Sequence, residues 1–302
     1  MTQRFGYYIV RDDEKMDIGR ESQPLSEDAW NDFNKYVAVA TDVRPFVIDY
    51  LSLKDDFEVV SGVTTRIKSE VAQRENPLAN IGINHLKTMA MAQGAISNFL
   101  SSASAFRDRA KTRLRAAFGK ASAEEQRFID TERAAYDGWF AYRLLYNLRN
   151  YGQHHDMPLS LVPVSARRKA DGKFAATANL LIDPTEILES DLIQNSFRKK
   201  ELSKLTEQLE LMPMVQQYMQ LHGLMLNLIV SIHLPRLVQM QEYEALLLEK
   251  TRIPSGAIPM IYEENEKGEI GRFHHFSFDE VLFLRELAGS IQKPDPDPFV
   301  NK

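Results

Sequence analysis

The strongest constraint on the fold is a long apolar stripe between residues 76 and 119. Apolar side chains recur there at spacings of three, four and seven residues, which is the spacing of side chains on one face of an α-helix. Asn76 followed by Pro77 is typical of a helix start, and Gly119 is typical of a helix end. The sequence therefore predicts one continuous amphipathic helix over this range.

A second amphipathic helix is predicted directly after the first. Ser122, with Glu125 three residues later, forms the pattern of a capping box. The stripe that follows is rich in aromatic residues and consists of Phe128, Ala135, Trp139, Tyr142 and Tyr146. Extending the same helical phase by three residues leads to Arg149. Two amphipathic helices joined by a short link are expected to pack antiparallel, as in a helical bundle.

Short strands are predicted on both sides of these helices. Two β-branched and aromatic runs, residues 5–10 and 36–40, predict strands near the N-terminus, whereas residues 43–53 fit either a strand or a short helix. Asp171-Gly172 predicts a hairpin near residues 161–182. A second hairpin is predicted near residues 258–278.

The remaining helical patterns complete the predicted architecture. They cover residues 183–211, which begin with Asp183-Pro184-Thr185, residues 215–248, where Pro235 is expected to cause a kink, and residues 278–292. The fold class predicted is mainly α, an antiparallel helical bundle with two β-hairpin insertions and a small mixed α/β N-terminal segment. We place that segment at residues 1–72, the helical domain at residues 73–292 and a disordered, proline-rich tail at residues 293–302.

Composition excludes several kinds of site. The chain has 302 residues and no cysteine, so it has no disulfide, thiolate metal site or cysteine nucleophile, and a reducing, cytoplasmic setting is expected. No apolar run approaches about 18 residues, so no membrane partner is expected. The formal net charge is −5. A nucleic acid therefore has to be bound by a local basic patch and not by the charge of the whole chain.

The residues with the strongest chemical signal follow the aromatic stripe. Arg149, Asn150 and His154 stand at its end. A guanidinium on the buried phase of a helix is costly unless it is paired or faces a polar cleft. One interpretation is that Arg149 reaches solvent at the helix end or pairs with an acid such as Asp156. The other is that it binds a phosphate through its planar fork, while a histidine nearby transfers protons near neutral pH.

The run Arg149-Asn150-x-x-x-His154 resembles the motif of HEPN domains, an Arg, usually followed by Asn, then a His after about four to six residues. In that family the motif lies late in a long helix of a small helical bundle. The resemblance extends over about residues 76–250 and implies a HEPN-like bundle. His155 also fits the looser spacing, so the choice of histidine stays open. No convincing third metal ligand accompanies His154-His155-Asp156, and we expect neither metal nor cofactor.

The resemblance implies a metal-independent endoribonuclease. Such an enzyme uses the 2′-hydroxyl of the substrate as the nucleophile and leaves a 2′,3′-cyclic phosphate and a 5′-hydroxyl. Arg149, Asn150 and His154 are the expected catalytic residues, with His155 and Tyr151 as possible supporting residues. The family further implies tRNA or another structured RNA as substrate, a homodimer with facing motifs, an inhibitory or activating protein partner, and a toxin or phage-defence setting.

Three basic clusters are candidates for contact with RNA. The first covers residues 107–115 and the third residues 198–200. The second belongs to the first hairpin and consists of Arg167, Arg168, Lys169 and Lys173. Because the second cluster follows the motif closely in sequence, we expect it to gather phosphates beside the site. For residues 107–115 we favour a solvated face.

A different class of function also fits the sequence. The helical domain would then be a non-catalytic module that binds or senses RNA, a nucleotide or a protein, and Arg149 and His154 would fasten a helix end. The other histidines do not point to a metal centre. His274 and His275 are adjacent in a predicted strand and face opposite sides, and His222 and His233 lie on an apolar helix and are interpreted as core residues.

Overall fold

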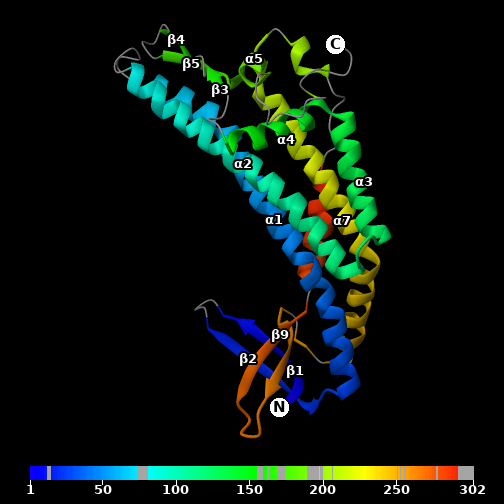
Figure 1. The fold of residues 1–302 in the computed structure, drawn as a ribbon. Coiled ribbons are helices and arrows are strands. Elements are labelled where there is room, and N and C mark those ends of the chain that lie inside the picture. The colour runs from blue at the N-terminus through cyan, green and yellow to red at the C-terminus, as the bar shows by residue number, and fades with distance from the viewer. Residues whose placement is uncertain are drawn as a thin grey trace. The chain divides into compact units, whose positions relative to one another are not determined.

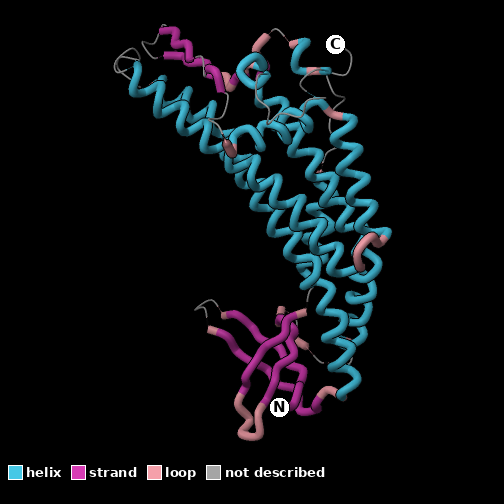
Figure 2. Tube along the Cα trace, in the orientation of Figure 1, coloured by secondary structure: helices cyan, strands magenta, loops and turns pink. Residues whose placement is uncertain are grey.

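The structure is a computed structural model with two compact units. The sheet unit consists of residues 1–45 and 228–290, and the helical unit consists of residues 46–227 and 291–302. The structure describes residues 1–11, 15–73, 81–154, 159–161, 164–168, 174–188, 197, 200–205, 207–249, 251, 253–254, 256–276 and 278–291. The predicted tail at residues 293–302 lies outside these ranges. The described chain is mainly α-helical with antiparallel strands (Figure 2), which confirms the predicted class.

The helix α1 (Glu27–Ala72) corrects the prediction for the N-terminal region. Residues 36–40, predicted as a strand, and residues 43–53, left open between strand and helix, both belong to α1. Buried residues recur in it with a period of seven and include Val39, Phe46, Leu53, Val60 and Ile67. That period fits one face of a helix and outweighs the β-propensity of the short run. The division between the two compact units falls inside α1, between Pro45 and Phe46, whereas the N-terminal segment predicted from the sequence ends at residue 72.

The sheet unit is built around one antiparallel sheet. Its strands are β1 (Thr2–Val10), β2 (Met16–Pro24), β8 (Ile258–Glu264) and β9 (Ile270–His275), in the order β2-β1-β8-β9 (Figure 1). The predicted strand at residues 5–10 and the predicted second hairpin are confirmed. The hairpin is not an insertion into the helical domain, because β8 pairs with β1. The helix α8 (Phe278–Ser290) follows it.

Local chemistry explains the pairing of β1 with β2. Gly19 stands opposite Tyr7, and a Cβ on Gly19 would overlap the Tyr7 ring. The tyrosine ring thus covers the backbone that a glycine leaves bare in a strand.

The core of the sheet unit contains Phe33, Leu247 and Ile261, with six partly buried hydrophobic side chains packed around them.

The helical unit contains the two amphipathic helices expected from the sequence. The first is α2 (Ile81–Phe118), and the predicted start at residues 76–80 lies outside the described ranges. The second begins as α3 (Ala123–Gly138), which packs against α2. The helix start predicted from Ser122 and Glu125 is confirmed, since the Glu125 N–H donates to Ser122 Oγ at 3.2 Å. The Glu125 carboxylate accepts from the N–H of Ala121, one residue before the N-cap, at 2.6 Å.

The predicted second helix is not continuous. Trp139 is extended, with φ −131° and ψ 118°, and separates α3 from α4 (Phe140–Gly152). Arg143 holds this break, because its Nη1 donates to the carbonyl oxygens of Tyr136 at 2.6 Å and Asp137 at 2.8 Å. These carbonyls have no intrahelical partner at a helix end. After the break, α4 runs in a different direction from α3 (Figure 1), so the last turn of α4, which carries the motif, is not in line with α3.

The segment after α4 forms short elements. The strands β4 (Val164–Arg168) and β5 (Phe174–Ala178) pair antiparallel, which confirms the first hairpin, although its Asp171-Gly172 turn lies outside the described ranges. A small sheet, in the order β3-β6-β7, contains β3 (Leu159–Leu161), β6 (Leu181–Ile182) and β7 (Leu209–Glu210). The helix predicted from residue 183 to residue 211 is confirmed only in part. The short α5 (Pro184–Leu188) forms its start and the described residues Phe197 and Lys200 are helical, whereas η1 (Leu202–Lys204) is a 3₁₀ turn and β7 begins at Leu209.

The helix α7 (Leu211–Leu248) confirms the helix predicted at residues 215–248 and includes Pro235. It is long and apolar enough to cross a membrane, but 56% of its most apolar window is buried inside the protein. Buried apolar helices of this kind are typical of protein cores. His222 and His233 on α7 are fully buried, as predicted.

Candidate active site at the end of α4

The predicted motif lies in the last turn of α4 and directly after it. Arg149, Asn150 and Tyr151 are half-buried in that turn, and α4 ends at Gly152. The backbone N–H of His154 then donates to the Tyr151 carbonyl oxygen at 3.0 Å, which closes one further turn. Seven of the thirteen residues of α4 are buried. The buried face fixes the rotation of the helix, and with it the direction in which its last turn presents the motif.

The Arg149 guanidinium is bound by neutral groups. Its Nη1 donates to Gln153 Oε1 at 2.7 Å and to Asn150 Oδ1 at 3.4 Å. Its Nε is buried and has no hydrogen-bond partner within the described ranges. Amide oxygens orient a guanidinium but do not neutralise its charge. Gln153 was not singled out from the sequence, although its position four residues after Arg149 places it on the same helix face.

His154 is exposed and stands apart from this network. Across the described residues, its ring forms no hydrogen bond or ion pair with Arg149 or Asn150. Arg149 lies in the last turn of α4 and His154 two residues after the helix, so both residues belong to the same helix end. The structure thus brings Arg149, Asn150 and Gln153 together and leaves His154 open to solvent beside them. His155, its rival, lies outside the described ranges, as does Asp156.

A second guanidinium is buried in the core next to α4. The Arg107 side chain on α2 is 5% exposed, and its Nη1 donates to Glu132 Oε1 at 3.3 Å and to the Tyr142 hydroxyl at 3.4 Å. Its guanidinium carbon lies 4.8 Å from the centre of the Tyr146 ring, a cation–π contact. Burial raises the pKa of Tyr142 well above its ordinary value. The Tyr142 hydroxyl therefore stays neutral beside Arg107.

Two buried side chains of α7 respond to these charges, Tyr218 to both arginines and His222 to Arg107. The pKa of Tyr218 is raised mainly by burial, and the charges of Arg107 and Arg149 both act to lower it. Burial also lowers the pKa of His222 to about 3, against the hydrogen bond of its Nδ1 with the Tyr218 carbonyl oxygen at 2.8 Å. His222 is therefore neutral near pH 7, and these core groups add no negative charge that would compensate Arg149.

The basic run on α2, predicted as a solvated face, is solvated only in part, because Arg109 and Arg115 stay more than half exposed. Arg107 is buried, and all five basic side chains pair with acids from other segments. The five pairs are Arg107–Glu132, Lys111–Glu132, Arg109–Asp49, Arg113–Asp49 and Arg115–Glu125. The sequence of α2 alone does not show these ion pairs, because the acids belong to α1 and α3, which pack beside α2.

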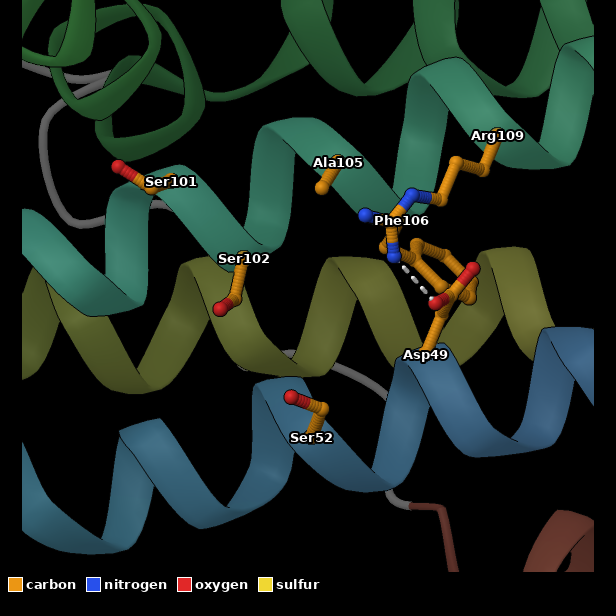
Figure 3. A pocket seen from close by; sticks show the side chains of 7 residues that line it. All are labelled: Asp49, Ser52, Ser101, Ser102, Ala105, Phe106 and Arg109. Atoms are coloured by element: carbon orange, nitrogen blue, oxygen red, sulfur yellow. Dashed lines mark hydrogen bonds and ion pairs between the residues drawn. The ribbon is translucent and has the colours of Figure 1, made fainter.

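Arg109, the second basic residue of this run, lines a small groove of about 260 Å³ between α1 and α2, and Figure 3 shows its side chain beside Asp49. Arg109 Nη1 donates to Asp49 Oδ1 at 2.8 Å, and Arg113 binds the other oxygen of the same carboxylate. Ser52, Ser101 and Ser102 complete the polar part of its lining. Because both guanidiniums are bound to Asp49, they are held as parts of the fold and not as a free basic surface.

The remaining predicted residues are placed only in part. Arg167 is exposed on β4, where it stands opposite Ala175, and Arg168 stands opposite Phe174. Lys169 and Lys173 lie outside the described ranges, so a role of this cluster in RNA binding stays a prediction. In β9, the His274 ring packs against Trp30 and the His275 ring against Tyr8. A search of the described residues finds no cluster of three metal-ligating side chains.

Comparison with known proteins gives no relative. No family model, no curated protein and no solved structure matches the chain. The likeness to HEPN domains therefore rests on Arg149, Asn150 and His154 and on their position at the end of a helix in a mainly helical chain.

Proposed function

We propose that this protein is a metal-independent endoribonuclease with a HEPN-like helical bundle, and that Arg149, Asn150 and His154 form its active site. One observation carries the proposal. Within the described ranges, Arg149 is held by neutral amide oxygens and not by a carboxylate. A guanidinium that is oriented but not neutralised can bind the oxygens of a phosphate. It does so beside an exposed histidine at the same helix end.

The proposed reaction needs only groups of the protein and the RNA. The 2′-oxygen of the substrate attacks the adjacent phosphorus, and the bond from phosphorus to the 5′-oxygen breaks. Arg149 binds the non-bridging oxygens, where charge builds up in the transition state. Asn150 and Gln153 hold its guanidinium in place. His154 takes the proton from the 2′-hydroxyl. In a homodimer with facing motifs, the second copy protonates the 5′-oxygen. The products carry 2′,3′-cyclic phosphate and 5′-hydroxyl ends.

The biological setting of this proposal follows the family. We propose a structured RNA such as tRNA as the substrate, a cytoplasmic location, and a role in a toxin or phage-defence system. In such a system a protein partner inhibits or activates the enzyme. The basic residues of the first hairpin, Arg167, Arg168, Lys169 and Lys173, would then hold the RNA on either side of the cleaved bond.

A second candidate is a non-catalytic module that holds an RNA phosphate through Arg149. The observation that favours it is the lack of any hydrogen bond between the His154 ring and Arg149 or Asn150 in the described part of the chain. Active-site hydrogen bonds often form only with substrate bound. The two candidates differ in one outcome, because a binding module retains RNA without cutting it.

The test is cleavage of total cellular RNA in the presence of EDTA. Wild type is compared with His154→Ala, and the matched control is His85→Ala, which removes an exposed histidine of α2. We expect wild type and His85→Ala to release fragments with cyclic-phosphate ends, and His154→Ala to lose activity by about 100-fold or more. Fragmentation by wild type that EDTA abolishes would instead require a metal. RNA that stays intact with wild type would refute the ribonuclease proposal.

A further inference from the structure

A pocket opens between α2, α3 and α4 beside the motif. We call it the tyrosine pocket. Its volume is about 330 Å³, which is in the range of small-molecule sites. Its lining consists of Lys111, Ile129, Glu132, Arg133, Tyr136, Tyr142 and Tyr146. Aromatic rings and cations thus meet in one cavity, a combination typical of sites for anionic aromatic ligands.

The aromatic part of the pocket is preorganised. The Tyr136 ring is nearly perpendicular to the rings of Tyr142 and Tyr146, at interplanar angles of 83° and 87° and centroid distances of 6.4 and 5.7 Å. Tyr142 is buried, whereas Tyr136 and Tyr146 are half-buried and keep ring surface at the cavity. Such edge-to-face packing fixes the rings before a ligand binds. A planar base can therefore stack on the Tyr136 ring, with its edge against Tyr146, at little entropic cost.

The charged part of the pocket carries an excess of positive charge. Glu132 is the one carboxylate of its lining, and it is shared by Lys111 at 2.6 Å and by Arg107, beneath the pocket, at 3.3 Å. Lys111 remains 31% exposed. Arg133 stands on the α3 wall and meets the exposed Asp130 only at 3.4 Å. Arg107 is buried, and its Nε has no hydrogen-bond partner in the described chain. The pocket is therefore suited to a ligand with one negative group.

The pocket adjoins the motif. Tyr146 stands three residues before Arg149 on the same face of α4, a rise of about 4.5 Å along the helix axis. Both pocket and motif also act on the buried Tyr218 hydroxyl, whose pKa responds to Arg107, Glu132, Tyr146 and Arg149. A ligand chain bound at Arg149 can therefore continue directly into the tyrosine pocket.

We infer that the tyrosine pocket binds a single nucleotide, with its base on Tyr136 and Tyr146 and its phosphate at Lys111 and Arg133. The position of this nucleotide next to the cleaved bond rests on the proposed function. The same chemistry is offered by a nucleotide of an RNA strand and by a free nucleoside monophosphate. We assign the pocket to the RNA strand, because Arg149 binds the next phosphate in the proposed reaction.

The test measures binding without cleavage. The full chain is titrated into fluorescein-labelled, 2′-O-methylated hexanucleotides of A, C, G or U, in which the attacking 2′-hydroxyl is blocked, and anisotropy is recorded. Tyr136→Leu removes the ring and Lys111→Gln removes the charge. The controls are Tyr136→Phe, which keeps the ring, and Arg127→Gln, which removes an exposed cation of α3 outside the pocket. Thermal unfolding of each variant verifies that it is folded.

We expect Tyr136→Leu and Lys111→Gln each to weaken binding by about tenfold, as the loss of one stacked base or one phosphate contact does. Tyr136→Phe and Arg127→Gln stay within about twofold of wild type. Competition with free nucleoside monophosphates tests whether the pocket binds a nucleotide of an RNA strand or a free nucleoside monophosphate. Weak competition supports the RNA strand, and displacement at equal concentration contradicts that assignment. If Tyr136→Leu and Lys111→Gln both bind the hexanucleotides with wild-type affinity, the assignment of nucleotide binding to the tyrosine pocket is wrong.

These outcomes are separable from those of the cleavage assay. A wild type that binds the hexanucleotides through Tyr136 and Lys111 but cuts no RNA would refute the ribonuclease and retain the nucleotide pocket. A wild type that cuts RNA, with Tyr136→Leu and Lys111→Gln variants of unchanged affinity and base preference, would refute the pocket and retain the ribonuclease.

Discussion

Arg107 on α2 and Arg149 on α4 show how differently one side chain is used within the helical unit. Both act electrostatically on the Tyr218 hydroxyl. Arg107 is buried and bound to Glu132, Tyr142 and Ser104, whereas Arg149 is half-buried and bound to two amides. A buried charge with a carboxylate partner belongs to the fold. A charge that is held in place without a carboxylate partner, as Arg149 is among the described residues, is available to a ligand.

The other arginines of the helical unit sharpen this contrast. Arg109, Arg113 and Arg115 pair with Asp49 or Glu125, and Arg143 binds Glu201 at 2.7 Å while it holds the break between α3 and α4. A run of basic residues in this sequence therefore does not by itself indicate a surface that is free to bind phosphates. In the proposed function, the lack of a carboxylate partner among the described residues distinguishes Arg149 from these four arginines.

The largest effect on stability is expected from Arg107→Ala. The substitution leaves Glu132 with Lys111 alone, removes the cation from the Tyr146 ring and opens a cavity. We expect the free energy of unfolding to fall by about 3 kcal/mol. Urea denaturation followed by circular dichroism measures it. Arg127→Ala, an exposed arginine on α3, is the matched control and should change it by less than about 0.5 kcal/mol. Equal free energies of unfolding for Arg107→Ala and Arg127→Ala would contradict the structural role that we give to Arg107.

Asp49→Asn is expected to cost less. Asp49 is nearly buried, but the side chain of Arg109 is 60% exposed, so solvent screens part of the unpaired charge. We expect a loss of about 2 kcal/mol in the free energy of unfolding. Asp55→Asn changes an exposed acid of the same helix and should be neutral. If Asp49→Asn is equally neutral, the paired arginines do not hold the fold as we describe.

Low pH is expected to lower the free energy of unfolding, because His222, which is buried in its neutral form beside Arg107, becomes protonated. Its folded pKa of about 3 lies below the ordinary histidine value near 6.5, so the unfolded chain binds the proton first. Its contribution to stability is complete above about pH 6.5 and is lost as the pH falls toward 3, by up to about 1.4 kcal/mol per pH unit. Urea titrations from about pH 6.5 to about pH 5 should show a shallower slope for His222→Asn than for wild type. Identical slopes would contradict a neutral, buried His222.

Local signals in the sequence predicted much of the helical unit. The apolar period of α2 and the helix-start signal of Ser122 and Glu125 act over a few residues, and both are confirmed. The strand predicted at residues 36–40 is wrong, because the β-propensity of five residues is outweighed by the helical period of the longer segment. The seven-residue period of Val39, Phe46 and Leu53 would have indicated α1. The break at Trp139 depends on Arg143 and Glu201, and no local pattern contains that pairing.

The residues of the candidate site come from a short sequence motif, and their catalytic role stays a prediction. The structure places Arg149, Asn150 and His154 at a helix end, but their surroundings were not predictable. The tyrosine pocket was not predictable, because it joins Lys111 of α2 to Tyr136 of α3 and Tyr146 of α4. The aromatic stripe indicated those tyrosines only as core or interface residues. The acid partners of the α2 arginines come from distant segments, and only tertiary packing reveals them.

The smallest effect on stability is expected from Arg149→Ala, and it gives the most direct test of the central claim. At equal folded concentration, the rate of RNA cleavage in EDTA is measured for wild type and Arg149→Ala. We predict a loss of about 100-fold or more in rate, because a transition-state charge loses its partner. The free energy of unfolding should change by less than about 1 kcal/mol, since no carboxylate within the described ranges is left unpaired. Cleavage at the wild-type rate, or a loss of stability as large as that of Arg107→Ala, would contradict the account.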